Sequence, residues 1–211
     1  MTFDESVEAL NTRLGGMLYF VEIGAMDGVS YDALHPHIVK NPNWQGVLVE
    51  PLPDMFEKLQ RTYAGRSNLS FENSAITSSN GTADITRIPP EKVNRECPPW
   101  SDGISTLRPD IHIIGQYGDL VPHTVNQTIQ TIDFLTLIDR HNVHSIDLLQ
   151  VDAEGYDKDI FDQVSRAGYN PYLIKLEVNY MMHTTIRDLK FSLEERGYTC
   201  FLEGDDMVAA R

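Results

Sequence analysis

The stretch FVEIGAMDGVSYDALH (Phe20–His35) begins as an apolar run that ends in an acid, passes through a glycine-containing turn and continues into a helical pattern. This order of strand, turn and helix is typical of β–α turns that bind nucleotides. The glycine spacing is not G-x-G-x-x-G, however, and Asp27 lies within the turn. We therefore expect a ligand at this turn that tolerates a nearby carboxylate.

Short apolar runs alternate with amphipathic segments along the rest of the chain. The runs predicted to be buried strands are MLYFVEIG, WQGVLVEP, NLSFENSAI, SIDLLQVD and PYLIKLEV. Helical patterns occupy residues 53–63, 131–141, 158–167 and 184–196. This alternation predicts an α/β fold, with a mostly parallel sheet and helices on both faces. The end of the chain, GYTCFLEGDDMVAAR, has two short runs around EGDD, which favours a hairpin over another crossover.

One segment, from Arg87 to His123, has no clear periodicity and contains six prolines. An irregular segment of this length in a compact domain is usually a functional lid or a disordered loop. GTADITRI before it and VNQTIQTID after it alternate polar with β-branched residues and could pair as an accessory ribbon. We expect a single domain over residues 1–211, with a lid or accessory insertion at about 82–130.

The composition narrows the class of partner. The formal net charge is −14 at pH 7, and the 17 Lys and Arg residues are scattered, which disfavours nucleic-acid binding. No apolar run approaches the roughly 20 residues of a membrane span, and the start MTFDESVEAL lacks the regions of a signal peptide. Cys97 and Cys200 make no disulfide framework. We therefore expect a cytoplasmic protein that acts on a small molecule, with neither nucleic acid nor membrane as partner.

Acidic residues dominate the carboxyl ends of the predicted strands, where open α/β sheets bind their ligands. These positions are Glu22 and Gly24, Glu50, Ser74 and Ala75, Asp152 and Glu154, and Glu177 and Asn179. The pyrophosphate of a dinucleotide would be repelled by Asp27 and Glu22. S-adenosylmethionine has no phosphate and a net positive charge, so it suits this acidic edge. Glu50 lies 22 residues after Gly28 and can accept both ribose hydroxyls of an adenosine.

Several motifs in combination resemble a known family. EIGAMDGVSYD, GVLVEPLPDMFEKL, NSAITSSNGTADI, IDLLQVDAEGYDKDIF and LIKLEV follow one another between Met17 and Val178. They resemble the motifs of the FkbM methyltransferases, which have an E-x-G-x-x-x-G turn, a V-E-P strand end and a D-x-E-G-x-[DE] motif. The resemblance implies the class I, Rossmann-like fold, with a seven-stranded, mostly parallel sheet and an antiparallel C-terminal strand. It also implies S-adenosylmethionine as methyl donor, S-adenosylhomocysteine as product, and biosynthetic methylation of hydroxyl oxygens on sugars, polyketides or related small molecules.

The resemblance also implies the cofactor-binding residues. It places Glu22, Gly24 and Gly28 at the methionine end, Glu50 at the ribose, and the residues Ser74, Ala75 and Ile76 beside the adenine. Ser105, in the short motif STL, is expected to face the cofactor. The remaining residues expected in contact with the cofactor are Ala25, Asp27, Pro51 and Asp152.

Catalysis then follows from the chemistry of the donor. The sulfonium is already activated, so in-line displacement mainly requires an acceptor oxygen held near the methyl carbon. A hydroxyl acceptor must also lose its proton to a carboxylate or an imidazole. Asp152, at the end of the central strand, is the first candidate for this base; Glu154, Glu177 and His123 come next. The same region could instead bind Mg²⁺ through the oxygen ligands Asp152, Glu154, Asp157 and Asn179, although their spacing is not diagnostic of a metal site.

Simpler interpretations of the same residues remain open. Glu22 and Glu50 could be solvated strand ends, and Asp152 or Glu154 could cap the helix that begins near Asp157. An NAD-type oxidoreductase on a related sheet is the alternative enzyme, which the missing third glycine and Asp27 disfavour. A catalytically inactive module that keeps the cofactor pocket is the alternative outside the enzymes.

Overall fold

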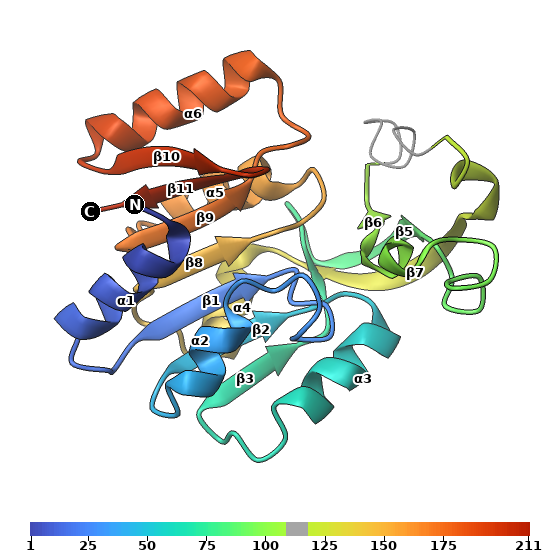
Figure 1. Cartoon of the computed structure of the whole chain (residues 1–211), viewed down its shortest axis with the longest axis horizontal. Helices are drawn as coiled ribbons and strands as arrows, with labels where there is room; N and C mark the ends of the chain where they lie inside the picture. The colour runs from blue at the N-terminus through green and yellow to red at the C-terminus, as the bar shows by residue number, and fades with distance from the viewer. Residues whose placement is uncertain (109–117) are drawn as a thin grey trace.

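A seven-stranded sheet forms the centre of the molecule, with the strand order β10-β11-β9-β8-β1-β2-β3 (Figure 1). The computed structural model describes residues 1–108 and 118–211. The strands of this sheet are β1 (Tyr19–Ile23), β2 (Gln45–Val49), β3 (Leu69–Glu72), β8 (Leu148–Val151), β9 (Leu173–Glu177), β10 (Thr199–Glu203) and β11 (Asp206–Ala210). β3, β2, β1, β8 and β9 pair in parallel, whereas β11 runs antiparallel to both β9 and β10. The predicted α/β fold, its mostly parallel sheet and the C-terminal hairpin are confirmed.

The strand order reverses between β1 and β8. From β1 the chain builds outward through β2 to β3, then returns to β8 on the other side of β1. At such a reversal the connections leave the sheet in opposite directions and open a crevice at the carboxyl ends of the strands. This geometry puts the loop after β1 and the loop after β8 next to each other.

Helices cover both faces of the sheet because successive strand side chains point to opposite sides. On one face, Phe20 of β1 packs in a core with α1 (Phe3–Arg13), α2 (His35–Lys40) and α3 (Pro53–Thr62). On the other, Val21 packs in a core with α4 (Phe134–Arg140), α5 (Asp157–Arg166) and α6 (His183–Glu195). Within residues 1–108 and 118–211, no helix has both the length and the apolar character needed to cross a membrane.

A second sheet carries the irregular part of the chain. Its order is β4-β7-β5-β6, with β4 (Ala75–Ile76), β5 (Gly81–Arg87), β6 (Ser105–Thr106) and β7 (Val125–Ile132). β5 and β7 pair antiparallel along their length, so the predicted accessory ribbon is confirmed. The ribbon projects beyond the carboxyl ends of the central strands (Figure 1), together with the short 3-10 helices η1 (Pro99–Gly103) and η3 (Val121–His123).

Two predicted elements have different bounds in the structure. NLSFENSAI is not one strand, because β3 ends at Glu72 and Ala75 begins β4 in the other sheet. The helix predicted over residues 131–141 begins only at Phe134, since Thr131 and Ile132 still belong to β7. Asp133 caps α4, as its side chain accepts a hydrogen bond from the Thr136 amide at 2.7 Å.

Candidate active site

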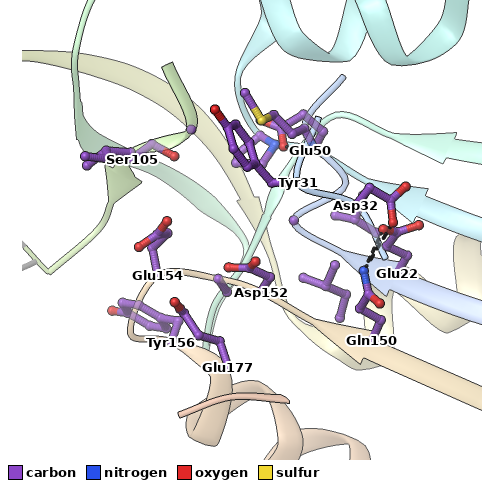
Figure 2. A pocket seen from close by; sticks show the side chains of 18 of the residues that line it. Glu22, Tyr31, Asp32, Glu50, Ser105, Gln150, Asp152, Glu154, Tyr156 and Glu177 are labelled. Carbon is purple, nitrogen blue, oxygen red and sulfur yellow. Dashed lines mark hydrogen bonds between the residues drawn. The ribbon is translucent and has the colours of Figure 1, made fainter. Parts of the chain in front are cut away.

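A cavity of about 460 Å³ opens at the carboxyl ends of β1, β2, β8 and β9 and extends to residues of the insertion (Figure 2). Most of the predicted site residues line it: Glu22, Gly24, Glu50, Pro51, Ser74, Ala75, Ile76, Ser105, Asp152, Glu154, Glu177 and Asn179. The other predicted site residues, Ala25, Asp27, Gly28, His123 and Asp157, lie outside its lining. The structure therefore brings together acids that are up to 155 residues apart in the sequence.

The Asp27 side chain stabilises the turn after β1 by accepting hydrogen bonds from residues of the same turn. Its Oδ1 accepts hydrogen bonds from the amides of Val29 and Ser30 at 3.0 and 2.7 Å, and its Oδ2 accepts one from the Ser30 hydroxyl. Partial burial opposes ionisation, but these hydrogen bonds outweigh it and hold the pKa of Asp27 below its ordinary value. The carboxylate in the turn therefore satisfies backbone donors, which explains its presence without a ligand.

The two glycines of the turn permit close packing. A Cβ on Gly24 (φ +91°) would lie 1.8 Å from the carbonyl oxygen of Asp152, so only glycine lets the ends of β1 and β8 approach this closely. A Cβ on Gly28 (φ +74°) would lie 2.7 Å from side-chain atoms of Leu59 and Tyr63 on the α3 side. Gly24 thus lines the cavity, whereas Gly28 packs the turn against the helix.

Glu50 is buried at the end of β2 and is held by the backbone. Its Oε2 accepts a hydrogen bond from the Met26 amide at 2.9 Å, and its Oε1 accepts one from the Leu52 amide at 2.8 Å. A carboxylate has about four acceptor positions, so two remain for other donors. Burial raises the pKa of Glu50 to about 7, although both amides and the Arg87 charge oppose the shift. Glu50 is thus a fixed acceptor rather than a solvated strand end.

Glu22 lies in a buried polar cluster with two residues that the sequence did not identify. Gln150 Nε2 donates to Glu22 Oε1 at 3.0 Å, and Asp32 lies beside both (Figure 2). Burial, followed by the nearby charge of Asp32, raises the pKa of Glu22 well above its ordinary range. Glu22 Oε2, Asp32 Oδ2 and Gln150 Oε1 are buried and have no hydrogen-bond partner in the structure.

A second carboxyl cluster lies at the ends of β8 and β9. Figure 2 shows Asp152, Glu154 and Glu177 around the same part of the cavity. Burial raises the pKa of Asp152 to about 6, and Lys175 limits the shift. Burial and the neighbouring carboxyls also raise the pKa values of Glu154 and Glu177. Carboxyls with raised pKa values that face a cavity are typical of general acids and bases.

The loop after β8 is held in a strained conformation. Glu154 has a φ of +49°, a value that L residues with side chains rarely adopt. Asp157 stabilises this loop, because its two carboxylate oxygens accept hydrogen bonds from the Ala153 and Gly155 amides at 3.0 and 3.1 Å. Tyr156 is the N-cap of α5 and makes no side-chain capping bond, so neither Asp152 nor Glu154 caps the helix. Glu154 lines the cavity instead.

His123 lies apart from these carboxyls. Its Nδ1 is 3.0 Å from Glu96 Oε2 within the insertion. Among the described residues, no group of three or more His, Cys, Asp or Glu side chains is arranged to hold a metal ion. The three cavity carboxyls are therefore the better placed of the predicted proton acceptors.

The lining residues that the sequence did not predict include Asp32, Gln150 and Lys175. Gln150 and Lys175 each interrupt an apolar strand, in SIDLLQVD and PYLIKLEV. A polar residue in the middle of a buried strand was the available signal, because such a residue needs a polar partner.

The residues present fit S-adenosylmethionine. Glu22, Asp32 and Gln150 form a buried polar cluster whose oxygen atoms can accept hydrogen bonds from a ligand ammonium. Glu50 offers fixed acceptor positions at the place expected for ribose hydroxyls. Ten of the residues that line the cavity are Asp or Glu, which favours a ligand with a net positive charge.

This chain is similar to several solved methyltransferase structures. The METTL16 MTase domain has a TM-score of 0.48 and 10% identity, with the match covering 97% of this chain and 65% of that one. Precorrin-6y C5,15-methyltransferase from Geobacter metallireducens GS-15 has a TM-score of 0.46 and 13% identity, covering 100% and 90%. Fibrillarin from Aeropyrum pernix, in complex with natively bound S-adenosyl-L-methionine, has a TM-score of 0.44 and 12% identity, covering 91% and 65%. This chain thus spans about two thirds of the length of two of these proteins.

No curated protein sequence matches this chain significantly. The Methyltransferase FkbM domain matches residues 22–200, from Glu22 near the end of β1 through the first residues of β10. The match includes both carboxyl clusters and the whole insertion. The chain therefore belongs to the FkbM methyltransferase family, and it is an S-adenosylmethionine-dependent methyltransferase.

Proposed function

We propose that the protein methylates a hydroxyl oxygen of a small molecule. The observation that carries this proposal is the cluster of Asp152, Glu154 and Glu177, whose side chains share one side of the cavity. A hydroxyl is a poor nucleophile until its proton is removed, and Asp152, the member of this cluster that is ionised at neutral pH, supplies a proton acceptor where β8 ends. An amine acceptor in its neutral form already has a free lone pair and would need no such base before it attacks the methyl group.

Separate parts of the cavity serve the donor and the acceptor. S-adenosylmethionine supplies an activated methyl group on its sulfonium and leaves as S-adenosylhomocysteine. Glu50 holds the ribose hydroxyls, and Glu22 lies toward the methionine end. Ser74, Ala75 and Ile76, which also line the cavity, flank the adenine. The second carboxyl cluster is then left for the acceptor.

Asp152 is the base in this proposal. With a pKa near 6 it is ionised at neutral pH and can accept the hydroxyl proton as the oxygen–methyl bond forms. Glu177 has its pKa raised by burial and by Asp152 and Glu154, so it keeps its proton at neutral pH. A protonated Glu177 can donate a hydrogen bond to the acceptor and orient it.

The charge of the cavity supports a small neutral or cationic acceptor. Asp102, Glu203, Asp205 and Asp206 also line it, in addition to the two clusters. A phosphate-rich acceptor would be repelled by these side chains. One similar solved structure is described as a fibrillarin pre-rRNA processing protein; the acidic cavity favours a different acceptor for this chain.

The test is methyl transfer to a panel of polyhydroxylated small molecules, with an RNA and a set of amines in parallel. We expect transfer to a hydroxyl oxygen, located by mass spectrometry, with kcat/KM rising with pH around 6. Asp152→Asn should lower kcat by a factor of about 100 or more while S-adenosylhomocysteine still binds. Asp205→Asn, which removes another acid of the cavity lining, is the matched control. Transfer to RNA alone, or an Asp152→Asn enzyme within threefold of wild type, would contradict the proposal.

A further inference from the structure

Three acids follow one another across the edge of three neighbouring strands. Val151 of β8 is in register with Leu176 of β9, and the next residue on each strand is an acid, Asp152 and Glu177. Glu177 is in turn in register with Asp206 of β11. All three acids line the cavity, and Figure 2 shows the first two of them. They form one acidic row along the cavity wall.

A single lysine lies beside this acidic row. Lys175 of β9 is two residues before Glu177, so the alternation along the strand places both side chains on the same face of the sheet. Lys175 Nζ is 2.6 Å from Asp206 Oδ2, and the lysine side chain is 12% exposed. Among the described residues that line the cavity, ten are acidic and Lys175 is the one basic residue. The cavity lining therefore offers the acidic row one positive charge.

That charge also acts on Asp152, at the other end of the acidic row. Lys175 is in register with Gln150, two residues before Asp152, so the lysine lies diagonally from Asp152 across the β8–β9 pair. Burial raises the pKa of Asp152, the Lys175 charge lowers it, and the negative charges of Asp206 and Asp32 raise it. The groups that interact electrostatically with Asp152 are Glu22 and Asp32 on the β1 side, Glu154 and Asp157 after β8, Lys175 and Glu177 on β9, and Asp206 on β11. Lys175 is the one cation of this set.

Only the ionised form of Asp152 can act as a base. The acceptor hydroxyl gives its proton to an Asp152 oxygen while its own oxygen bonds to the methyl carbon, and the electrons of the broken sulfur–methyl bond remain on sulfur. The middle member of the acidic row shows how strongly this environment favours the protonated form. Burial and the charges of Asp152 and Glu154 raise the pKa of Glu177 to about 11, so Glu177 keeps its proton at neutral pH.

We propose that Lys175 keeps the Asp152 carboxyl ionised for proton transfer, and that Asp206 sets the strength of this effect by holding the lysine ammonium. Lys175 is then a positioning residue, because it acts through Asp152. An ion pair that only tied β9 to β11 would give Lys175 and Asp206 the same role. In the proposal their charges act on Asp152 with opposite signs, which separates the two explanations. The inference rests on the proposed function in one respect, that Asp152 is the base.

The experiment is the pH profile of kcat/KM at saturating donor, with a hydroxyl acceptor from the panel above. We expect Lys175→Met to move the rising limb of the profile to higher pH by about one unit or more, because Asp152 loses its compensating charge. Asp206→Asn should move the limb to lower pH, because Asp152 loses a negative neighbour. Lys175→Arg keeps the charge and should restore the wild-type limb. Shifts of Lys175→Met and Asp206→Asn in the same direction, or an unmoved limb in both, would overturn the inference.

Lys158→Met is the matched control for loss of a paired lysine. Lys158 Nζ is also 2.6 Å from an aspartate, Asp162 on α5, but neither residue lines the cavity. This variant should therefore keep the wild-type limb. Calorimetry with S-adenosylhomocysteine checks that each variant is folded. If Lys175→Met does not fold, Asp206→Asn decides alone, and a limb that is unmoved or moved to higher pH overturns the inference.

Asp152→Asn separates failure of this inference from failure of the proposed function. If Asp152→Asn retains activity, Asp152 is not the base and the proposed function is wrong. If Asp152→Asn loses activity while Lys175→Met keeps the wild-type limb, the inference alone is overturned. Should no acceptor of the panel be methylated, a carboxyl-carbon NMR titration of Asp152, assigned with Asp152→Asn, measures the same shifts, and the same outcomes decide.

Discussion

At Gly24 the sheet permits no side chain. The position of its missing Cβ is 1.8 Å from a backbone oxygen, and backbone atoms cannot yield as a flexible side chain can. We expect Gly24→Ala to lower the free energy of unfolding by about 3 kcal/mol or more, from the clash together with the positive φ. Urea unfolding followed by circular dichroism measures this change.

Gly65→Ala is the matched control for that variant. Gly65 has a φ of +85°, close to the +91° of Gly24, but no atom lies within 4 Å of its Cβ position. Only the backbone conformation is then penalised, at about 1 kcal/mol. Equal losses for the two variants would show that β1 and β8 do not approach as closely as the structure has them.

Single residues of the site differed in how well the sequence predicted them. Glu22, Glu50 and Asp152 were predictable because each ends an apolar run, and strand ends meet at one edge of a parallel sheet. Asp27 has the same appearance in the sequence, but its role depends on hydrogen bonds inside the turn. The hydrogen bond of Gln150 to Glu22 depends on the register of strands more than a hundred residues apart, which no local pattern encodes.

At the level of elements, long periodic segments were predicted and short ones were not. α2 has six residues, one of them proline, and β6 has two, so neither shows a full period. α1 was also absent from the prediction, although Thr2 and Glu5 form a capping box at its start. The late start of α4 follows from β-branched Thr131 and Ile132, which fit both the end of a strand and the start of a helix.

The ribbon of β5 and β7 is an element whose pairing was predicted and whose attachment was not. Arg87 is buried and forms two hydrogen bonds with the Asp54 carboxylate at the start of α3. Thr106 of β6 donates to the Glu154 carbonyl at 2.9 Å. These contacts hold the insertion at two points, and the second of them joins it to the loop after β8 beside the cavity.

At the scale of the whole molecule, concentrated buried acids make stability depend on pH. Burial raises the pKa values of Glu50 and Asp157 to about 7 and that of Asp152 to about 6, with Glu22, Glu154 and Glu177 also raised. In the unfolded chain these groups titrate near 4. The folded state thus binds more protons between about pH 4 and pH 7, and its stability falls as pH rises through this window.

We therefore expect the urea midpoint of the protein without ligand to decrease from pH 5 to pH 8. Glu177→Gln should raise stability at pH 8 and leave it nearly unchanged at pH 5, because the variant removes one of the groups that resist ionisation. Glu195→Gln replaces an exposed glutamate of α6 in the same way and should leave the stability nearly unchanged at both pH values. A midpoint that increases with pH, or equal effects of the two variants, would count against buried acids as the cause.

Binding of S-adenosylhomocysteine to wild type and to Glu50→Gln, measured by calorimetry at pH 8, tests the central claim most directly. Glutamine keeps the size of the side chain but offers one oxygen acceptor where the carboxylate has two, each of which also accepts a hydrogen bond from a backbone amide. Glu72→Gln, a buried acid bonded to Arg140 and His141 outside the cavity lining, is the control. We predict micromolar binding by wild type and Glu72→Gln, and at least tenfold weaker binding by Glu50→Gln. Absence of binding by the wild type, or tighter binding of NAD than of S-adenosylhomocysteine, would contradict the assignment of this cavity to a methyl donor.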